Sequence, residues 1–186
     1  MKTLFESAAE LQRFLAGKGW KFCFIGGIAL QRWGEPRLTL DADISLLTGF
    51  GREEEVAREI IAAYRPRIND AVAFARENRV LPVEAGNGAR FDISLAAFDF
   101  EEEIIDRASY FDFSPSVRLL TCSAEDLAVM KAFACRDKDL ADLRTIVARQ
   151  GAALDKKTVL ERLKPLAAIK PEEDILGKIM PILGKL

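Results

Sequence analysis

Two aspartates, Asp41 and Asp43, stand two residues apart in a segment that alternates polar and apolar residues. Successive side chains of a β-strand point to opposite faces, so the two carboxylates would share a face, about 7 Å apart along the strand. Ala42 and Ile44 would then point to the other face, into a core. Mg²⁺ takes oxygen ligands, commonly one or two carboxylates together with substrate phosphates. The spacing therefore predicts a Mg²⁺ site, and Mn²⁺ accepts the same ligands.

A pair of glycines, Gly26 and Gly27, follows an apolar segment at residues 21–25. Glycine allows backbone N–H groups to approach a phosphate closely. A phosphate-binding turn that precedes metal-binding carboxylates predicts chemistry on a nucleotide.

A third carboxylate, Asp92, lies in a second alternating segment, where Phe91 and Ile93 flank it. If this strand lies beside the strand of Asp41 and Asp43 with its faces aligned, the three carboxylates converge. Such convergence is strongly unfavourable unless cations are bound. Two Mg²⁺ ions would form a clamp for in-line displacement at phosphorus. Asp92 would then hold the catalytic metal and assist deprotonation of the attacking hydroxyl.

The chain of 186 residues contains no histidine. This excludes a Ser-His-Asp or Cys-His triad and an HExxH zinc site. Proton transfer must therefore fall to carboxylates, lysine, tyrosine or bound water. The net charge of −2 indicates no overall attraction to nucleic acid or to a membrane surface.

The three cysteines form no CxxC pair, and their odd number is typical of reduced thiols in a cytoplasmic protein. No apolar run approaches the roughly 20 residues of a membrane-spanning helix. The first residues lack the apolar core of a signal peptide. We therefore expect a cytoplasmic protein with no membrane partner.

Hydrophobic periodicity and turn residues predict an alternation of helices and strands. Strands are expected at residues 21–25, 40–47, 79–84, 89–95 and 117–121. Helices are expected at residues 5–16, 28–33, 53–64, 124–135 and 138–150, with Asp155 capping a further helix and Pro171 in the first turn of the last. The fold class is α/β (α+β), a small mixed β-sheet flanked by helices. Residues 1–120 would form this core, and residues 121–186 a C-terminal helical region packed on it.

The motifs resemble those of the DNA polymerase β-type nucleotidyltransferase superfamily. Three segments carry the resemblance, namely Gly26-Gly27-Ile28-Ala29, Arg37-x-Thr39-x-Asp41-x-Asp43 and Phe91-Asp92. Small bacterial members, including abortive-infection-type toxins and lincosamide-type adenylyltransferases, are the most similar subgroup. Met130-Lys131 and the charged run at residues 136–143 also resemble this subgroup. The resemblance covers roughly residues 20–145.

The resemblance implies that the protein transfers a nucleoside monophosphate from an NTP to a hydroxyl or phosphate and releases pyrophosphate. Asp41, Asp43 and Asp92 would be the catalytic and metal-binding carboxylates. Gly26 and Gly27 would hold the triphosphate through their backbone. Further nucleotide contacts would come from Arg37, Thr39, Lys131 and Arg136. Many members have Gly-Ser where this chain has Gly26-Gly27, so one hydroxyl contact is absent here.

Several of these residues also have purely structural interpretations. Asp92 could be a solvated strand residue, and Lys131 a solvated side chain on a helix. The charged run could be a helix face in which Arg136 and Asp139 pair at spacing three.

The sequence leaves the acceptor and the base open. RNA such as tRNA, a protein side chain or a small molecule could accept the nucleotide, and the enzyme could be a toxin paired with an antitoxin protein. An alternative is a non-catalytic nucleotide-sensing or partner-binding module on the same fold. A third interpretation is a scaffold whose helical tail pairs with another subunit.

Overall fold

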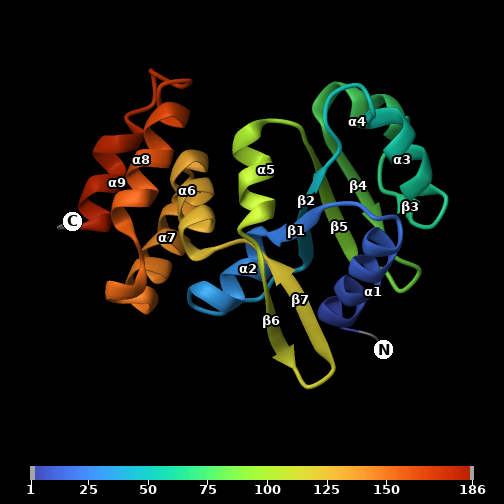
Figure 1. Ribbon diagram of the computed structural model, residues 1–186, viewed down its shortest axis with the longest axis horizontal. Helices are drawn as coiled ribbons and strands as arrows, with labels where there is room; N and C mark the ends of the chain where they lie inside the picture. Colours follow the sequence, from blue (N-terminus) through green and yellow to red (C-terminus); the bar gives the residue numbers. More distant parts are fainter. Residues whose placement is uncertain (1–2, 185–186) are drawn as a thin grey trace. The chain divides into compact units, whose positions relative to one another are not determined.

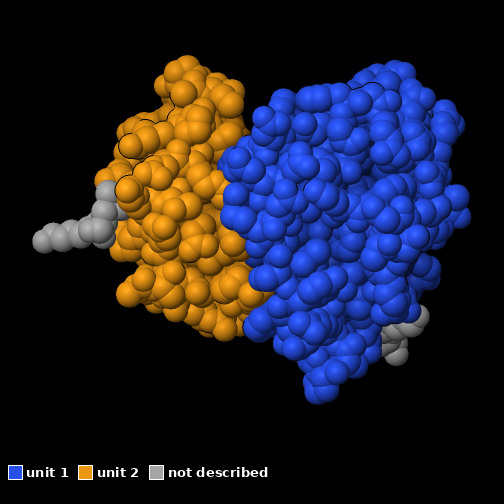
Figure 2. Space-filling model, in the orientation of Figure 1, with its two compact units in different colours: residues 1–28, 38–122 blue, residues 29–37, 123–186 orange. Residues whose placement is uncertain are grey.

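The computed structural model describes residues 3–184. The chain divides into two compact units (Figure 2). Unit 1 comprises residues 1–28 and 38–122, and unit 2 comprises residues 29–37 and 123–186. The sequence-based division at residue 120 stays a prediction about domains.

Unit 1 is built on a mixed sheet of seven strands in the order β3-β4-β5-β2-β1-β7-β6, counted over the described residues. The strands are β1 (Phe22–Ile25), β2 (Asp41–Leu47), β3 (Arg65–Pro66), β4 (Val80–Glu84), β5 (Arg90–Ala96), β6 (Ser109–Ser114) and β7 (Val117–Thr121). Strand β2 lies at the centre, antiparallel to β1 and parallel to β5. The pairs β3–β4, β4–β5 and β6–β7 are antiparallel, and β1 runs parallel to β7.

The core of unit 1 lies between one face of this sheet and the helices α1 (Leu4–Gly17), α3 (Glu53–Ile61) and α4 (Ala71–Asn78). Alternate strand residues such as Ile44 and Ile93 are fully buried there, as the period of two requires. The residues between them face the other way, and α5 (Asp99–Asp106) contacts β1 and β2 (Figure 1).

Unit 2 is helical. Its elements are α6 (Ala124–Ala134), α7 (Asp137–Gln150), the short 3₁₀ helix η1 (Gly151–Ala153), α8 (Lys156–Ala167) and α9 (Ile175–Leu183). Helix α6 packs against α7, α8 and α9. Helix α2 (Gly26–Trp33) begins in unit 1 and continues into unit 2.

Most of the elements expected from periodicity are present, including the central strands and the helices at residues 124–135 and 138–150. The fold class is confirmed as a mixed α/β architecture. Helix α2 begins earlier than expected, so the glycine pair forms its first turn. The last helix begins at Ile175, because the Asp174 side chain accepts a hydrogen bond from the Gly177 N–H; Pro171 therefore lies before it, and its predicted place was wrong.

Several short elements were not predicted, among them β3, α4 and β6. Strand β3 has only two residues. Asp70, the residue before α4, has a left-handed backbone conformation, and its side chain makes no capping hydrogen bond. The usual signal for a helix start is therefore missing. Strand β6 is largely exposed and shows no alternation of buried and exposed residues.

The side chains of Cys23, Cys122 and Cys135 are buried, and among residues 3–184 they form no disulfide. No helix between residues 3 and 184 combines the length and the apolar character that crossing a bilayer requires.

Candidate active site

Strands β2 and β5 bring two of the predicted carboxylates together. Their parallel register places Asp43 directly opposite Asp92, and Asp41 opposite Arg90. The condition stated for convergence, that the two carboxylate-bearing strands are neighbours with aligned faces, is therefore met. Because Ala42, Ile44 and Ile93 are buried on the core face, the aspartates face away from the core. The side chains of Asp41 and Asp92 remain 40% and 35% exposed, open to a ligand from solvent.

The glycine pair packs directly against Asp43. Gly26 has φ of +54°, and a Cβ built on it would lie 2.0 Å from Asp43 Oδ2. The Gly27 N–H, in the first turn of α2, donates a hydrogen bond to the same oxygen at 3.3 Å. The positive end of a helix stabilises a carboxylate at this place. Glycine is thus required at position 26 by both the backbone conformation and the space.

Thr39 fills the space beside Gly27. A Cβ at position 27 would lie 2.4 Å from Thr39 Oγ1, which is closer than real Cβ contacts. The same hydroxyl donates to the Asp41 backbone oxygen at 2.9 Å. A serine at position 27 would therefore collide with Thr39. The Thr39 hydroxyl lies where the side chain of residue 27 would begin.

An arginine not singled out as a site residue also contacts this edge. Arg67 Nη2 lies 3.0 Å from Asp92 Oδ1, and Arg67 Nη1 lies 3.7 Å from Asp41 Oδ1. Asp41 Oδ1 and Arg67 Nη1 are buried, and neither has a hydrogen-bond partner among residues 3–184. The guanidinium thus faces both carboxylates but leaves polar groups unsatisfied.

The three aspartates fit a hard divalent cation by the chemistry of their donors. Carboxylate oxygens suit Mg²⁺ and Mn²⁺. Within the described residues, the buried oxygen of Asp41 lacks the hydrogen-bond partner that buried polar atoms normally have. Within the described part of the chain, however, no three Asp, Glu, His or Cys side chains stand close enough to hold a metal together. Side-chain rearrangement, including movement of Arg67, would have to accompany metal binding.

Unit 2 contains the remaining predicted nucleotide contacts, and there they belong to an ion-pair network around three buried side chains, Lys131, Asp139 and Asp142. Lys131 is 8% exposed. Its Nζ lies 2.9 Å from Asp139 Oδ1 and 2.8 Å from Asp142 Oδ2. Arg37 donates to both oxygens of Asp142, at 2.9 and 3.0 Å, and Arg136 pairs with Asp139. We refer to these five residues as the Lys131 network.

The network keeps its carboxylates ionised. Burial opposes ionisation of Asp139, but hydrogen bonds from Arg136 and Lys131 outweigh it and hold the pKa of Asp139 below its ordinary value. For Asp142, burial is likewise outweighed by hydrogen bonds from Arg37 and Lys131, and its pKa is also lowered. Lys131 is therefore not the solvated side chain of the structural interpretation, whereas Arg136 and Asp139 do pair at spacing three.

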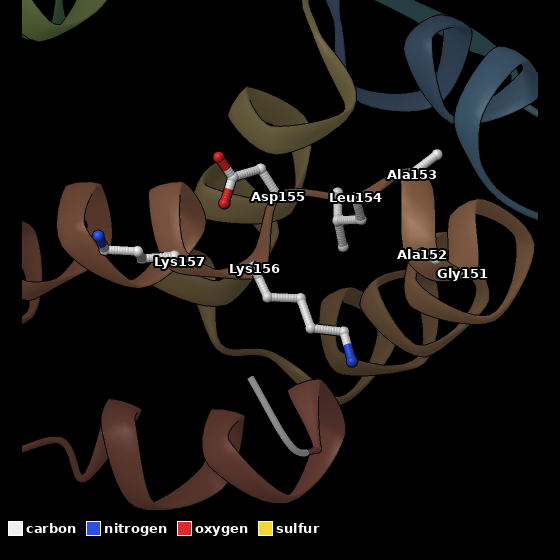
Figure 3. Close-up of a pocket in the computed structure, with 7 residues that line it drawn as sticks. All are labelled: Gly151, Ala152, Ala153, Leu154, Asp155, Lys156 and Lys157. Carbon is white, nitrogen blue, oxygen red and sulfur yellow. The ribbon is translucent and has the colours of Figure 1, made fainter.

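Unit 2 also carries a surface hollow of about 660 Å³, lined by residues 151–157. Figure 3 shows the side chains of Asp155, Lys156 and Lys157 spread apart around it. None of the lining residues is a predicted site residue.

Arg67 is not among the residues that the sequence motifs predict for the site. Like Arg65, Arg76 and Arg79, it pairs with acidic side chains of unit 1. Arg67 follows Pro66, and no motif marks it. Only the strand order links Arg67 to the site, because β3 pairs with β4 and β4 pairs with β5, the strand of Asp92.

A family model described as "Nucleotidyl transferase AbiEii toxin, Type IV TA system" matches residues 11–170. The chain belongs to this family. It is accordingly a nucleotidyltransferase, as the resemblance to the polymerase β-type superfamily implied.

Solved structures of nucleotidyltransferase-like proteins share the fold. An antigenic nucleotidyltransferase-like protein from Paracoccidioides brasiliensis is 14% identical, with a TM-score of 0.54 over 91% of this chain and 89% of that one. The antibiotic-resistance factor ANT(2'')-Ia is also 14% identical, with a TM-score of 0.56 over 91% of this chain and 96% of that one. A second structure of ANT(2'')-Ia, in complex with adenylyl-2''-tobramycin, has a TM-score of 0.52 at 14% identity, over 88% of this chain and 98% of that one. Comparison with curated protein sequences gives no match.

Proposed function

We propose that this protein transfers a nucleoside monophosphate from an NTP to a hydroxyl or phosphate of an acceptor, with Mg²⁺ as cofactor, and releases pyrophosphate. The observation that carries the proposal is the placement of Asp43 opposite Asp92, with the N-terminus of α2 directly beside Asp43. Family membership supports nucleotidyl transfer in general. Metal, nucleotide, acceptor and the roles of single residues belong to the proposal.

In this mechanism Asp41, Asp43 and Asp92 would hold the divalent cation. Once bound, the ion would offset the charge of the triphosphate and polarise the reacting phosphate. Asp92 would accept the proton of the attacking hydroxyl, because no histidine is available for that role. The Gly26–Gly27 backbone would hold the triphosphate at the start of α2, where helix N–H groups favour anions. Thr39 would position Asp41 through its hydrogen bond to the Asp41 carbonyl.

Arg37, Lys131 and Arg136 are proposed nucleotide contacts on the strength of the family resemblance. Lys131 is already held by Asp139 and Asp142, and Arg37 binds Asp142 through two hydrogen bonds. Their positive charges are therefore fixed in place before any ligand arrives. A fixed cation loses little side-chain entropy when it binds a phosphate.

The acceptor is proposed by class only: RNA such as tRNA, a protein side chain or a small molecule. The family's printed description names a toxin of a type IV toxin–antitoxin system. We therefore propose a toxin activity in the cytoplasm, with an antitoxin protein as partner. Solved ANT(2'')-Ia in complex with adenylyl-2''-tobramycin supports a small-molecule acceptor as the second class to test.

The deciding experiment measures pyrophosphate release with each of the four NTPs and Mg²⁺, in the presence of cellular RNA or of a small-metabolite extract. Wild-type protein is compared with Asp41→Asn and Asp43→Asn, and with Asp112→Asn as a matched control on the exposed strand β6. Acceptor-dependent release that is lost in the first two variants and kept in the control is expected. Equal release from Asp43→Asn and wild type would overturn the assignment of this site.

One observation favours the non-catalytic alternative. Arg67 already faces Asp41 and Asp92, as it would in a module that needs no metal. NTP binding without pyrophosphate release, across every acceptor fraction tested, would support a nucleotide-sensing module instead of the enzyme.

A further inference from the structure

Arg67 is held at the acidic edge of unit 1 by its backbone. It directly follows β3, and its N–H donates to the Pro82 backbone oxygen on β4 at 3.0 Å. Only 24% of its side chain is exposed. Because Pro82 lies opposite Asp92 in the β4–β5 register, this bond anchors Arg67 at the level of that carboxylate, with β4 between them. The arginine is part of the local architecture and not a surface side chain that happens to reach the site.

The guanidinium spans two carboxylates from different strands. Its Nη2 is 3.0 Å from Asp92 Oδ1, while its Nη1 is 3.7 Å from Asp41 Oδ1. A planar fork with several N–H donors is suited to such bridging. The fit to Asp41 is nevertheless loose, since Nη1 and Oδ1 are both buried and, among residues 3–184, both lack a hydrogen-bond partner. Buried polar atoms without partners are costly. A ligand that satisfies the Asp41 oxygen would thus be favoured over Arg67 at this position.

We propose that Arg67 is a resident counter-cation that occupies the carboxylate pair in the metal-free protein and competes with the divalent metal for it. This inference rests on the proposed function, because it presupposes that Asp41 and Asp92 bind the metal. Two cations close to the same carboxylates repel each other. Metal binding therefore draws the guanidinium away from at least one of the two aspartates.

If Arg67 competes with the metal, its removal has opposite effects on two quantities, the melting temperature and the metal affinity. Without metal, the loss of Arg67 removes the cation that Asp41 and Asp92 share, so their mutual repulsion grows and the melting temperature falls. With metal, the loss of the competing charge tightens binding. A merely structural arginine would give a different result, because its removal would loosen the site and weaken metal binding.

The test is the affinity for Mn²⁺ alone, measured by isothermal titration calorimetry and by the EPR signal of free Mn²⁺, on the full chain without nucleotide. Arg67→Met is expected to bind Mn²⁺ about fivefold more tightly than wild type, as for the loss of an ion pair worth roughly 1 kcal/mol. Its melting temperature in EDTA is expected to fall. Arg65→Met is the matched control. It removes the same charge two residues away, from an arginine that pairs with Glu84. Its affinity should stay within about twofold of wild type.

Two further variants separate the outcomes. Asp41→Asn should abolish the binding, which shows that the Mn²⁺ site is the proposed one. If Asp41→Asn abolishes it but Arg67→Met leaves it equal or weaker, the competition is overturned and the metal site stands. If Asp41→Asn binds Mn²⁺ as tightly as wild type, or if wild type binds none, the proposed metal site fails and this inference fails with it. Should circular dichroism show Arg67→Met to be unfolded, Arg67→Gln, which keeps amide donors but no charge, is measured against the same expectation.

Discussion

Asp43 of β2 and Asp92 of β5 lie directly opposite each other on parallel strands. Like charges at directly opposed positions of a sheet destabilise it. Arg67 pairs with Asp92 at 3.0 Å and lies 3.7 Å from Asp41, while Asp43 accepts a hydrogen bond from the Gly27 N–H. The pair is thus an arrangement that costs stability and that the proposed chemistry needs.

Asp43→Asn is expected to raise the melting temperature of the metal-free protein while it abolishes pyrophosphate release. Removal of one charge relieves repulsion worth about 0.2–1 kcal/mol, or roughly 1–3 °C for a chain of this size. The asparagine oxygen can still accept the Gly27 N–H. Differential scanning fluorimetry in EDTA measures the shift. The control Asp112→Asn, on exposed β6, should change the melting temperature by less than about 1 °C. A lower melting temperature for Asp43→Asn would contradict the repulsion.

Gly27→Ala is expected to destabilise unit 1 by roughly 1–3 kcal/mol, because its Cβ would collide with Thr39 Oγ1. In a Thr39→Ala background the same change should cost less, since that hydroxyl is gone. Urea unfolding of the four proteins gives the coupling energy as a double-mutant cycle. Gly86→Ala serves as the control, because a Cβ there meets no atom of the described chain within 4 Å. Additive effects at positions 27 and 39 would show that the collision is relieved in some other way.

Lys131→Met is expected to cost about 3–5 kcal/mol of unfolding free energy in unit 2. The change leaves the buried carboxylates of Asp139 and Asp142 without their shared partner. The Arg136 side chain is 64% exposed, so Arg136→Met should lower the free energy of unfolding by less than about 1 kcal/mol. Urea denaturation followed by circular dichroism compares the two. Equal costs would mean that Lys131 is not the central cation of the network.

The Lys131 network also predicts a loss of stability in acid. The pKa values of Asp139 and Asp142 are lower in the folded protein than the ordinary value of 3.8. A lowered folded pKa contributes stability that is present above the ordinary value and is lost as the pH falls through the folded one. Unfolding free energy measured from pH 5 down to pH 2 should therefore fall below about pH 4, and fall less steeply for Asp142→Asn. Identical slopes for variant and wild type would rule out Asp142 as a source of this acid sensitivity.

Much of unit 1 could be predicted from the sequence because its strands alternate regularly. The alternation of polar and apolar residues was enough to predict both carboxylate-bearing strands. That they are neighbours with aligned faces was a condition of the three-carboxylate hypothesis, and the register meets it. Local rules suffice here, since a period of two fixes which side chains are buried.

The partners of these residues could not be predicted, because they depend on contacts between distant parts of the chain. Arg67 meets Asp41 and Asp92 only through the pairing of β3 with β4 and of β4 with β5. Arg37 and Asp142 are 105 residues apart in sequence but form a two-point ion pair. Neither pairing leaves a periodic pattern in the sequence. The assignments of Arg37, Lys131 and Arg136 to the nucleotide stay predictions.

Residues 29–37 interrupt unit 1 and group with the helices that follow residue 122. Hydrogen bonds tie this segment to α7, among them Glu35 N–H to Thr145 Oγ1, Gln150 Nε2 to the Trp33 oxygen, and Arg149 to the Gly34 oxygen. A fragment cut after residue 122 would retain the segment but lose every one of these partners. The helical unit is therefore built from two separate segments of the chain and is not a C-terminal addition. A single recombination breakpoint could neither add nor remove the whole unit, because residues 29–37 would be left without the helices against which they pack.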